Sequence, residues 1–226
     1  MHRAESVAHA AGLAMLFAMA GCGEVLRLGD GACQKGQVAA GEVLWIGDSW
    51  VTTPGNQVTH VQDLARAAGA IGPNDLYVNR GIVGAAIATI AGQYNIQESG
   101  PIKVRVLILD GGGIDLIQSG VSDAVVANVV STFTQLLATV ASDGTVQQVI
   151  YFLVPEVAAI PGISTALRPG MKQACEASAV PCYFLDLQPF FTGHPEYVDG
   201  IQATDAGAVV QGDAIWNVMQ QNCIAQ

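Results

Sequence analysis

The chain has 226 residues, of which 51% are hydrophobic and only 12% are charged. This composition is typical of a folded protein with a large core and excludes a disordered chain. Nineteen acidic residues against nine basic ones give a formal net charge of −10, and no basic stripe interrupts the sequence, so we expect no nucleic-acid binding.

The first 22 residues have the features of a targeting segment. An apolar run over about residues 10–21 follows a weakly basic start, and it is too short to span a bilayer, which takes roughly 20 residues. It ends in Met19-Ala20-Gly21-Cys22, which resembles the lipobox of bacterial lipoproteins, where the cysteine is lipidated. An ordinary signal peptide cleaved nearby is the alternative. Both predict export, either to the cell envelope through a lipid anchor at Cys22 or as a secreted protein, and no other membrane contact is expected.

Export gives meaning to the other four cysteines, which allow three pairings. Cys175 and Cys182 lie seven residues apart across a turn, which favours a local bridge and leaves Cys33 to pair with Cys223. No spacing resembles a zinc ribbon, so we expect neither a metal nor a cofactor.

Apolar runs and helical periodicity alternate along the chain after a tether at residues 23–42. The folded domain, residues 43–226, is predicted to have strands at residues 43–46, 76–79, 103–109, 148–154 and 183–187. Helices are predicted at about residues 58–68, 85–94, 123–142, 169–177 and 205–220, with Ser122 and Thr204 as caps. Because most strands are continuous apolar runs separated by helices, we expect an α/β protein with a parallel sheet covered on both faces.

The stretch Val43–Trp50 places polar residues directly after a buried strand. Gly47, Asp48 and Ser49 follow the apolar run, and ligands of open α/β sheets bind beyond such strand ends. A nucleophile at Ser49 is one interpretation. The alternative is that Asp48 and Ser49 only cap the next helix.

Over about residues 43–220, the chain resembles the SGNH (GDSL-type) hydrolases, a family of esterases and lipases. Gly47-Asp48-Ser49 matches the first of its four sequence blocks, Asn79–Gly84 resembles the second, and Asp199-Gly200-Ile201 resembles the last. The resemblance implies a three-layer, flavodoxin-like α/β/α fold with a parallel sheet of about five strands. It also implies Ser49 as the nucleophile, with the N–H groups of Ser49 and Gly84 in the oxyanion hole.

Two positions depart from the family pattern. Ile114 stands where the third block has an asparagine that donates to the oxyanion, and Gln202 stands where the last block has the histidine base. A glutamine amide cannot take a proton from serine near neutral pH. The glycines before Ile114 offer a repair, because the N–H of Gly113 could join the oxyanion hole, although the same glycines are also typical of a tight turn.

His194 is the candidate replacement for the missing base, with Asp199, or else Glu196, as its partner. An exposed histidine without a role is the alternative. His60, on the helix after Ser49, is expected to be structural. Trp50 could line an acyl pocket or pack in the core.

These residues lead to two functional hypotheses. The first is an exported serine ester hydrolase that acts on a small-molecule or polymeric ester through Ser49, His194 and Asp199. The alternative, favoured by the paired loss of asparagine and histidine, is a catalytically silent binding lipoprotein of the cell envelope. A metal site on Asp48, Asp110 and Asp199 is less favoured, because acidic residues at strand ends are common in this fold.

Overall fold

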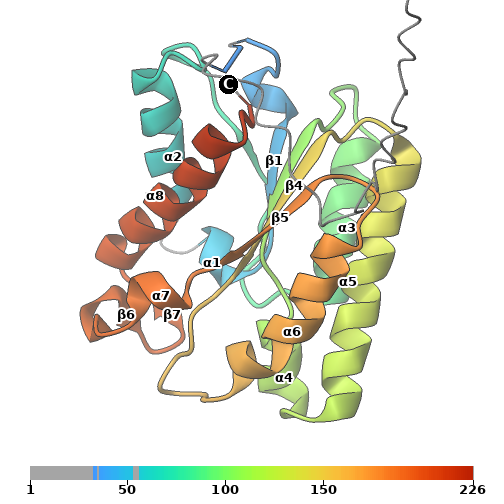
Figure 1. Ribbon diagram of the computed structural model, residues 1–226, viewed down its shortest axis with the longest axis vertical. Coiled ribbons are helices and arrows are strands. Elements are labelled where there is room, and N and C mark those ends of the chain that lie inside the picture. The colour runs from blue at the N-terminus through green and yellow to red at the C-terminus, as the bar shows by residue number, and fades with distance from the viewer. Residues whose placement is uncertain (1–32, 35, 53–55, 226) are drawn as a thin grey trace, which may run out of the picture. The chain divides into compact units, whose positions relative to one another are not determined.

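Five parallel strands form the central sheet, in the order β2-β1-β3-β4-β5 (Figure 1). The computed structural model describes residues 33–34, 36–52 and 56–225, so the predicted targeting segment with Cys22 lies outside the described residues. The strands are β1 (Val43–Ile46), β2 (Val78–Asn79), β3 (Val106–Leu109), β4 (Gln148–Leu153) and β5 (Cys182–Asp186). The predicted three-layer, flavodoxin-like fold with a five-stranded parallel sheet is confirmed.

The direction in which strands are added reverses at β1. The chain passes from β1 to its neighbour β2 on one side and then returns to pair β3 with the other side, with Val43 opposite Val106. In open α/β sheets, ligands bind beyond the carboxyl ends of the strands at such a reversal. This places the residues that follow β1 and β3 at the expected site.

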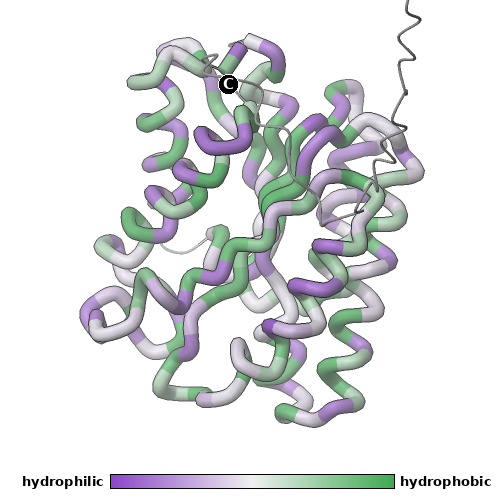
Figure 2. The backbone as a smooth tube through the Cα atoms, in the orientation of Figure 1, coloured by the Kyte–Doolittle hydropathy of each residue, from purple (hydrophilic) through white to green (hydrophobic). Residues whose placement is uncertain are grey.

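Helices cover both faces of the sheet. On one face lie α2 (Asn56–Ala67) and α8 (Asp205–Gln221), and on the other lie α3 (Ile87–Glu98), α5 (Asp123–Asp143) and α6 (Ile163–Glu176). Successive strand residues point to opposite faces, so Trp45 packs in one core and Ile46 in the other. Both cores are apolar, which explains strands such as β3 that are hydrophobic throughout. Figure 2 shows hydrophobic stretches of the backbone in the centre of the fold. α5 is long and apolar enough to cross a membrane, yet its inner residues, such as Phe133, are buried in the second core.

The two predicted helix caps are confirmed. The Ser122 side chain accepts a hydrogen bond from Val125 N–H, and the Thr204 side chain accepts one from Gly207 N–H. The helix predicted from residue 169 instead begins at Ile163, with Pro169 inside it. The carboxylate of Glu156 explains the earlier start, because it accepts hydrogen bonds from N–H groups around the first turn of α6.

Several short elements were not predicted. They are α1 (Ser49–Thr52), α4 (Gly113–Ser119), α7 (Gln188–Phe191), the 3-10 turns η1 (Ala40–Glu42) and η2 (Pro195–Tyr197), and the hairpin of β6 (Val198–Asp199) and β7 (Gln202–Ala203). They are too short to show a periodic hydrophobic pattern. All except η1 follow the carboxyl end of a sheet strand, where the site lies.

Both predicted disulfides are present. Cys33 pairs with Cys223 just beyond α8, and Cys175 on α6 pairs with Cys182 at the start of β5. Paired cysteines are typical of oxidising compartments, so the bridges fit an extracellular or envelope protein.

Candidate active site

Ser49 is the first residue of α1, directly beyond the carboxyl end of β1. Asp48 caps this helix, because its Oδ1 accepts a hydrogen bond from Trp50 N–H at 2.9 Å and its carbonyl oxygen accepts one from Val51 N–H at 3.2 Å. The capping interpretation is therefore confirmed for Asp48. Ser49 is only 3% exposed and borders a pocket, so it remains the candidate nucleophile.

Buried polar side chains contact the turn at Gly47, just before Ser49. The amide of Gln93 on α3 donates to Gly47 O at 3.0 Å and accepts from Gly47 N–H at 2.8 Å. Gly47 has φ +152°, and a Cβ there would lie 1.8 Å from Oδ1 of Asp110. A side chain is excluded here, which is the physical reason for a glycine at this position.

Asp48 and Asp110 form a buried carboxyl pair next to Ser49. Oδ1 of Asp110 accepts a hydrogen bond from the backbone N–H of Asp48 at 2.9 Å, while its Oδ2 has no hydrogen-bond partner among the described residues. Burial, followed by the charge of Asp48, raises the pKa of Asp110 well above its ordinary value. Burial also raises the pKa of Asp48, against the opposing effect of hydrogen bonds from its neighbours. Because two adjacent buried carboxylates repel each other, we expect the pair to keep a proton at pH values where an ordinary aspartate has already lost it.

The glycines after Asp110 make the tight turn that leads into α4. Gly111 and Gly112 have φ of +141° and +97°, and a Cβ on Gly111 would lie 2.6 Å from Cδ1 of Ile90. The turn interpretation is confirmed. Gly113 lines the same pocket as Ser49, a position that is compatible with the predicted role of its N–H in the oxyanion hole.

A pocket opens beside Ser49, and its space amounts to about 380 Å³ when the open solvent at its mouth is counted. Its walls come from α1, α4, the segment after β4, the start of α6 and the turn between β6 and β7. The polar side chains in it are those of Asp48, Ser49 and Ser164. The remaining side chains are apolar: Trp50, Ile114, Ile117, Val154, Pro155, Val157, Ile163 and Ile201. Trp50 is both buried, at 4% exposure, and part of the pocket wall.

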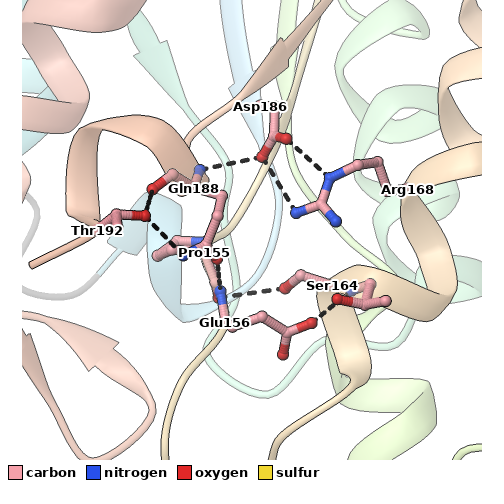
Figure 3. A network of polar contacts seen from close by, with 8 residues as sticks. Pro155, Glu156, Ser164, Arg168, Asp186, Gln188 and Thr192 are labelled. Atoms are coloured by element: carbon pink, nitrogen blue, oxygen red, sulfur yellow. Dashed lines mark hydrogen bonds and ion pairs between the residues drawn. The ribbon is translucent and has the colours of Figure 1, made fainter.

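Hydrogen bonds hold the segment after β4 that forms one wall of the pocket (Figure 3). The carboxylate of Glu156 accepts from Gly162 N–H at 2.9 Å, and Oε1 of Gln188 accepts from Glu156 N–H at 2.6 Å. The hydroxyl of Ser164 donates to the carbonyl oxygen of Pro155 at 3.1 Å. These contacts join the segment to α6 and α7, so the wall is defined before any ligand binds.

An ion pair ties α6 to the end of β5 behind this wall (Figure 3). Nε of Arg168 lies 2.7 Å from Oδ2 of Asp186, and Oδ1 of Asp186 accepts from Gln188 N–H at 3.0 Å. Because both charged side chains are partly exposed, the ion pair contributes through its geometry more than through its energy.

Residues 79–84, which resemble the second block of the family, form hydrogen bonds with the backbone at Gly47 and Val51, on either side of Ser49. Ile82 N–H donates to Gly47 O at 2.9 Å, and Nδ2 of Asn79 donates to Val51 O at 3.3 Å. Gly84 has φ +75° and is exposed in the turn before α3. It is not among the described residues that line the pocket, so its oxyanion role stays a prediction.

His194 is exposed and held by its own loop. Its Nδ1 lies 2.9 Å from Oε1 of Glu196, and its ring stacks on Tyr197 with 4.6 Å between ring centroids. The hydrogen bond from His194 lowers the pKa of Glu196. Asp199 is exposed on β6, and no hydrogen bond joins it to His194 in the described structure. Neither His194 nor Asp199 lines the pocket with Ser49, so the structure does not bring this predicted triad together.

Ile201 is the residue that the β6–β7 hairpin places in the pocket. Its carbonyl oxygen accepts a hydrogen bond from Nε1 of Trp50 at 2.9 Å, which ties the hairpin to α1. Gln202 pairs with Asp199 across the hairpin. Ile114, the other departure from the family pattern, is 7% exposed and forms part of the pocket wall.

Side chains of α2 and α8 hold α1 from the opposite side. Nε2 of Gln57 and Nε2 of Gln211 both donate to the carbonyl oxygen of Trp50, at 2.6 and 3.1 Å. His60 joins the same two helices, with its Nε2 2.7 Å from Oδ1 of Asp213. That contact fits the structural role predicted for His60.

The three carboxylates considered as a metal site do not form one group. Asp48 and Asp110 are buried together, whereas Asp199 is exposed on the hairpin. Within the part of the chain that the structure describes, no three His, Cys, Asp or Glu side chains are placed to hold a metal ion.

Sequence reasoning missed the polar residues that support the nucleophile turn. Gln57, Gln93 and Gln211 are buried, and Asp110 was considered only as a candidate metal ligand. A signal for one of them was present, since Gln93 shares the inner face of α3 with Ile90 and Tyr94, where an apolar residue is expected. The pocket wall after β4 carries no comparable motif.

Several solved structures share this fold, although no family profile and no curated protein sequence matches the chain. A carbohydrate esterase family 3 protein from Talaromyces cellulolyticus has a TM-score of 0.64 at 14% identity, covering 80% of this chain and 96% of its own. A psychrotrophic esterase from Pseudoalteromonas has a TM-score of 0.63 at 12% identity, with coverages of 80% and 98%. A protein from Parabacteroides merdae described as a GDSL-like lipase has a TM-score of 0.65 at 17% identity, with coverages of 83% and 99%. At these identities the likeness establishes a common fold: the chain has the α/β architecture of carbohydrate esterases and GDSL-like hydrolases.

Proposed function

We propose that this protein is an exported serine ester hydrolase with Ser49 as its nucleophile. The observation that carries the proposal is the position of Ser49. It lies beyond β1, at the reversal of the sheet, and borders a pocket that also contains Gly113 from the segment after β3. The esterases that share the fold support the same reaction class.

In the proposed reaction, Oγ of Ser49 attacks the ester carbonyl and the alcohol leaves, after which water hydrolyses the acyl-serine. The negative charge on the carbonyl oxygen would be stabilised by backbone N–H groups of Ser49, Gly113 and Gly84. One such donor is worth about 10²–10³-fold in rate, so backbone groups can offset the loss of an asparagine at Ile114.

His194 is the proposed general base, with Asp199 as its partner. It is one of two histidines in the described residues, and the other, His60, bonds to Asp213 between α2 and α8. His194 belongs to the same segment as Ile201, which enters the pocket. The imidazole must leave Glu196 and turn towards Ser49, so the proposal requires residues 194–203 to rearrange when substrate binds.

A silent binding protein is the second candidate, and one observation favours it. No histidine is among the described residues that line the pocket, and apolar side chains form most of its walls. In this candidate the pocket binds an apolar group and catalyses no reaction on it.

Labelling with a fluorophosphonate and hydrolysis of p-nitrophenyl esters separate the two candidates. The enzyme should label at Ser49, and Ser49→Ala should abolish both label and hydrolysis. His194→Ala should lower kcat by about 10²–10⁴-fold, the usual contribution of a general base. His60→Ala is the matched histidine control and should retain activity. Absence of both labelling and hydrolysis in the unmodified protein would reject the hydrolase and leave the binding protein.

Lipid anchoring at Cys22 belongs to the same proposal. The two disulfides support an oxidising compartment for the folded domain. Metabolic labelling with a radioactive fatty acid should mark the full-length protein but not a Cys22→Ser variant. Equal labelling of both would exclude the anchor.

A further inference from the structure

We propose that the pocket beside Ser49 binds the acyl chain of the ester and selects aliphatic chains longer than acetyl. This inference rests on the proposed ester hydrolysis and names its substrate class. It separates this protein from solved structures of the same fold that are described as acetyl xylan esterases.

Aliphatic side chains surround the space next to the nucleophile. Ile114 and Ile117 on α4 lie on one side, Val154 and Val157 follow β4, and Ile163 opens α6. An acyl chain extends from the carbonyl carbon that Ser49 attacks, so the group entering this space is the chain itself. Burial of each methylene would favour binding of longer chains.

Asp48 and Ser164, the polar side chains of the pocket other than the proposed nucleophile, are already engaged. The Ser164 hydroxyl donates to Pro155 O, and the Asp48 carboxyl caps α1 through Trp50 N–H while pairing with Asp110. A hydroxyl-rich ligand such as a sugar ring would therefore lose its bonds to water without finding free side-chain partners, which is unfavourable. The pocket discriminates against a sugar and accepts a hydrocarbon.

One aliphatic wall residue also reaches the surface of the protein. Ile117 lines the pocket and is 37% exposed. A chain that extends from the pocket along Ile117 therefore keeps an apolar contact before it enters water.

Ile114 gives this pocket its distinctive feature. The family pattern has a polar oxyanion donor at this position, whereas here a buried isoleucine faces the same space as Ser49. The substitution removes a donor and extends the apolar wall in one step. In the acylation step, a bond forms between Ser49 Oγ and the carbonyl carbon, the bond from that carbon to the alcohol oxygen breaks, and the serine proton ends on the leaving alcohol.

Hydrolysis of p-nitrophenyl acetate, butanoate and hexanoate tests the proposal. kcat/KM should rise about tenfold from acetate to butanoate, since each buried methylene is worth about fourfold at most. Ile117→Ser should lower the butanoate-to-acetate ratio several-fold. Ile96→Ser, which changes an aliphatic side chain that is 72% exposed on α3, is the matched control and should leave the ratio unchanged.

Acetate hydrolysed as fast as butanoate would overturn the proposal. A second series, acetate esters of ethanol, butanol and hexanol, checks which part of the ester the pocket holds. Rates that rise with the alcohol and not with the acyl chain would also overturn it.

Failure of the proposed function is distinguished by a binding measurement. If no ester is hydrolysed and Ser49 does not label, NMR titration with hexanamide and acetamide still measures the affinity of the pocket for a long and a short chain. Tighter binding of hexanamide, weakened in Ile117→Ser but not in Ile96→Ser, would retain the apolar acyl site. Equal binding of the two amides would reject it.

Discussion

Replacing Asp110 by asparagine should remove a pH dependence of stability that the buried carboxyl pair creates. Asp110 is completely buried beside Asp48, and burial raises its pKa well above its ordinary value of 3.8. In the unfolded chain the same carboxyl is solvated and titrates near that ordinary value. Between the two pKa values, the native state holds a proton that the unfolded state releases.

The sign and size of the effect follow from this difference. Because the native state binds the extra proton, stability from this group is complete below about pH 4 and falls as pH rises through the raised native pKa. The slope approaches about 1.4 kcal/mol per pH unit for one proton. An asparagine at position 110 keeps an oxygen that can accept from Asp48 N–H and adds an amide N–H that can donate to the Asp48 carboxyl, but it does not titrate.

Urea unfolding followed by tryptophan fluorescence between pH 4.5 and 8 measures the effect. The stability of Asp110→Asn relative to the unmodified protein should increase with pH across this window. Asp63→Asn is the control, because Asp63 is an exposed carboxylate paired with Arg66. A difference between Asp110→Asn and the unmodified protein that does not change with pH would refute the shared proton.

Two further predictions concern the backbone turn and the disulfides. Gly47→Ala should reduce the free energy of unfolding by on the order of 3 kcal/mol, because its Cβ would lie 1.8 Å from Asp110 Oδ1 at φ +152°; Gly92→Ala, a helical position with open space around it, should cost nothing in the same urea titration. Replacing Cys33 and Cys223 together by serine should cost about 5 kcal/mol against about 2.5 kcal/mol for Cys175 and Cys182, since chain entropy grows with the separations of 190 and 7 residues. Equal losses from the two double variants would contradict that entropic account.

The sequence predicts the sheet well because its three central strands, β1, β3 and β4, are buried on both faces. Runs such as Val106–Leu109 are continuous and apolar, and glycine or proline marks their ends, so strand positions could be predicted. Both helix caps could be predicted as well, because serine and threonine are typical cap residues. Pro169 misled the prediction for α6, because proline favours the first turn of a helix yet here lies inside one. The Glu156 carboxylate caps the start of α6 by accepting hydrogen bonds from Gly162 and Thr165. Such contacts leave no periodic pattern in the sequence, so the start of α6 could not be predicted.

The site divides in the same way between local and tertiary information. The turn from Gly47 to Ser49 is a local pattern and could be identified directly. The contacts of Gln93 with Gly47 and of Asp110 with Asp48 join residues 46 and 62 positions apart, so no spacing rule reveals them. The hairpin places Ile201 in the pocket and leaves His194 exposed on Glu196, and that orientation depends on side-chain packing that a sequence pattern does not contain.

The two departures from the family pattern have different physical consequences. Ile114 acts inside the pocket, where an apolar wall excludes water and strengthens the interaction of any charge with the backbone N–H groups of Ser49 and Gly113. Gln202 acts outside it, in a hairpin whose two short strands pair with each other and which the Trp50–Ile201 hydrogen bond ties to α1. In the proposed enzyme, the backbone N–H groups of Ser49 and Gly113 would replace the missing oxyanion donor, whereas the base would require movement of residues 194–203. For the proposed enzyme we therefore expect movement of the hairpin, and not attack by Ser49, to limit the rate.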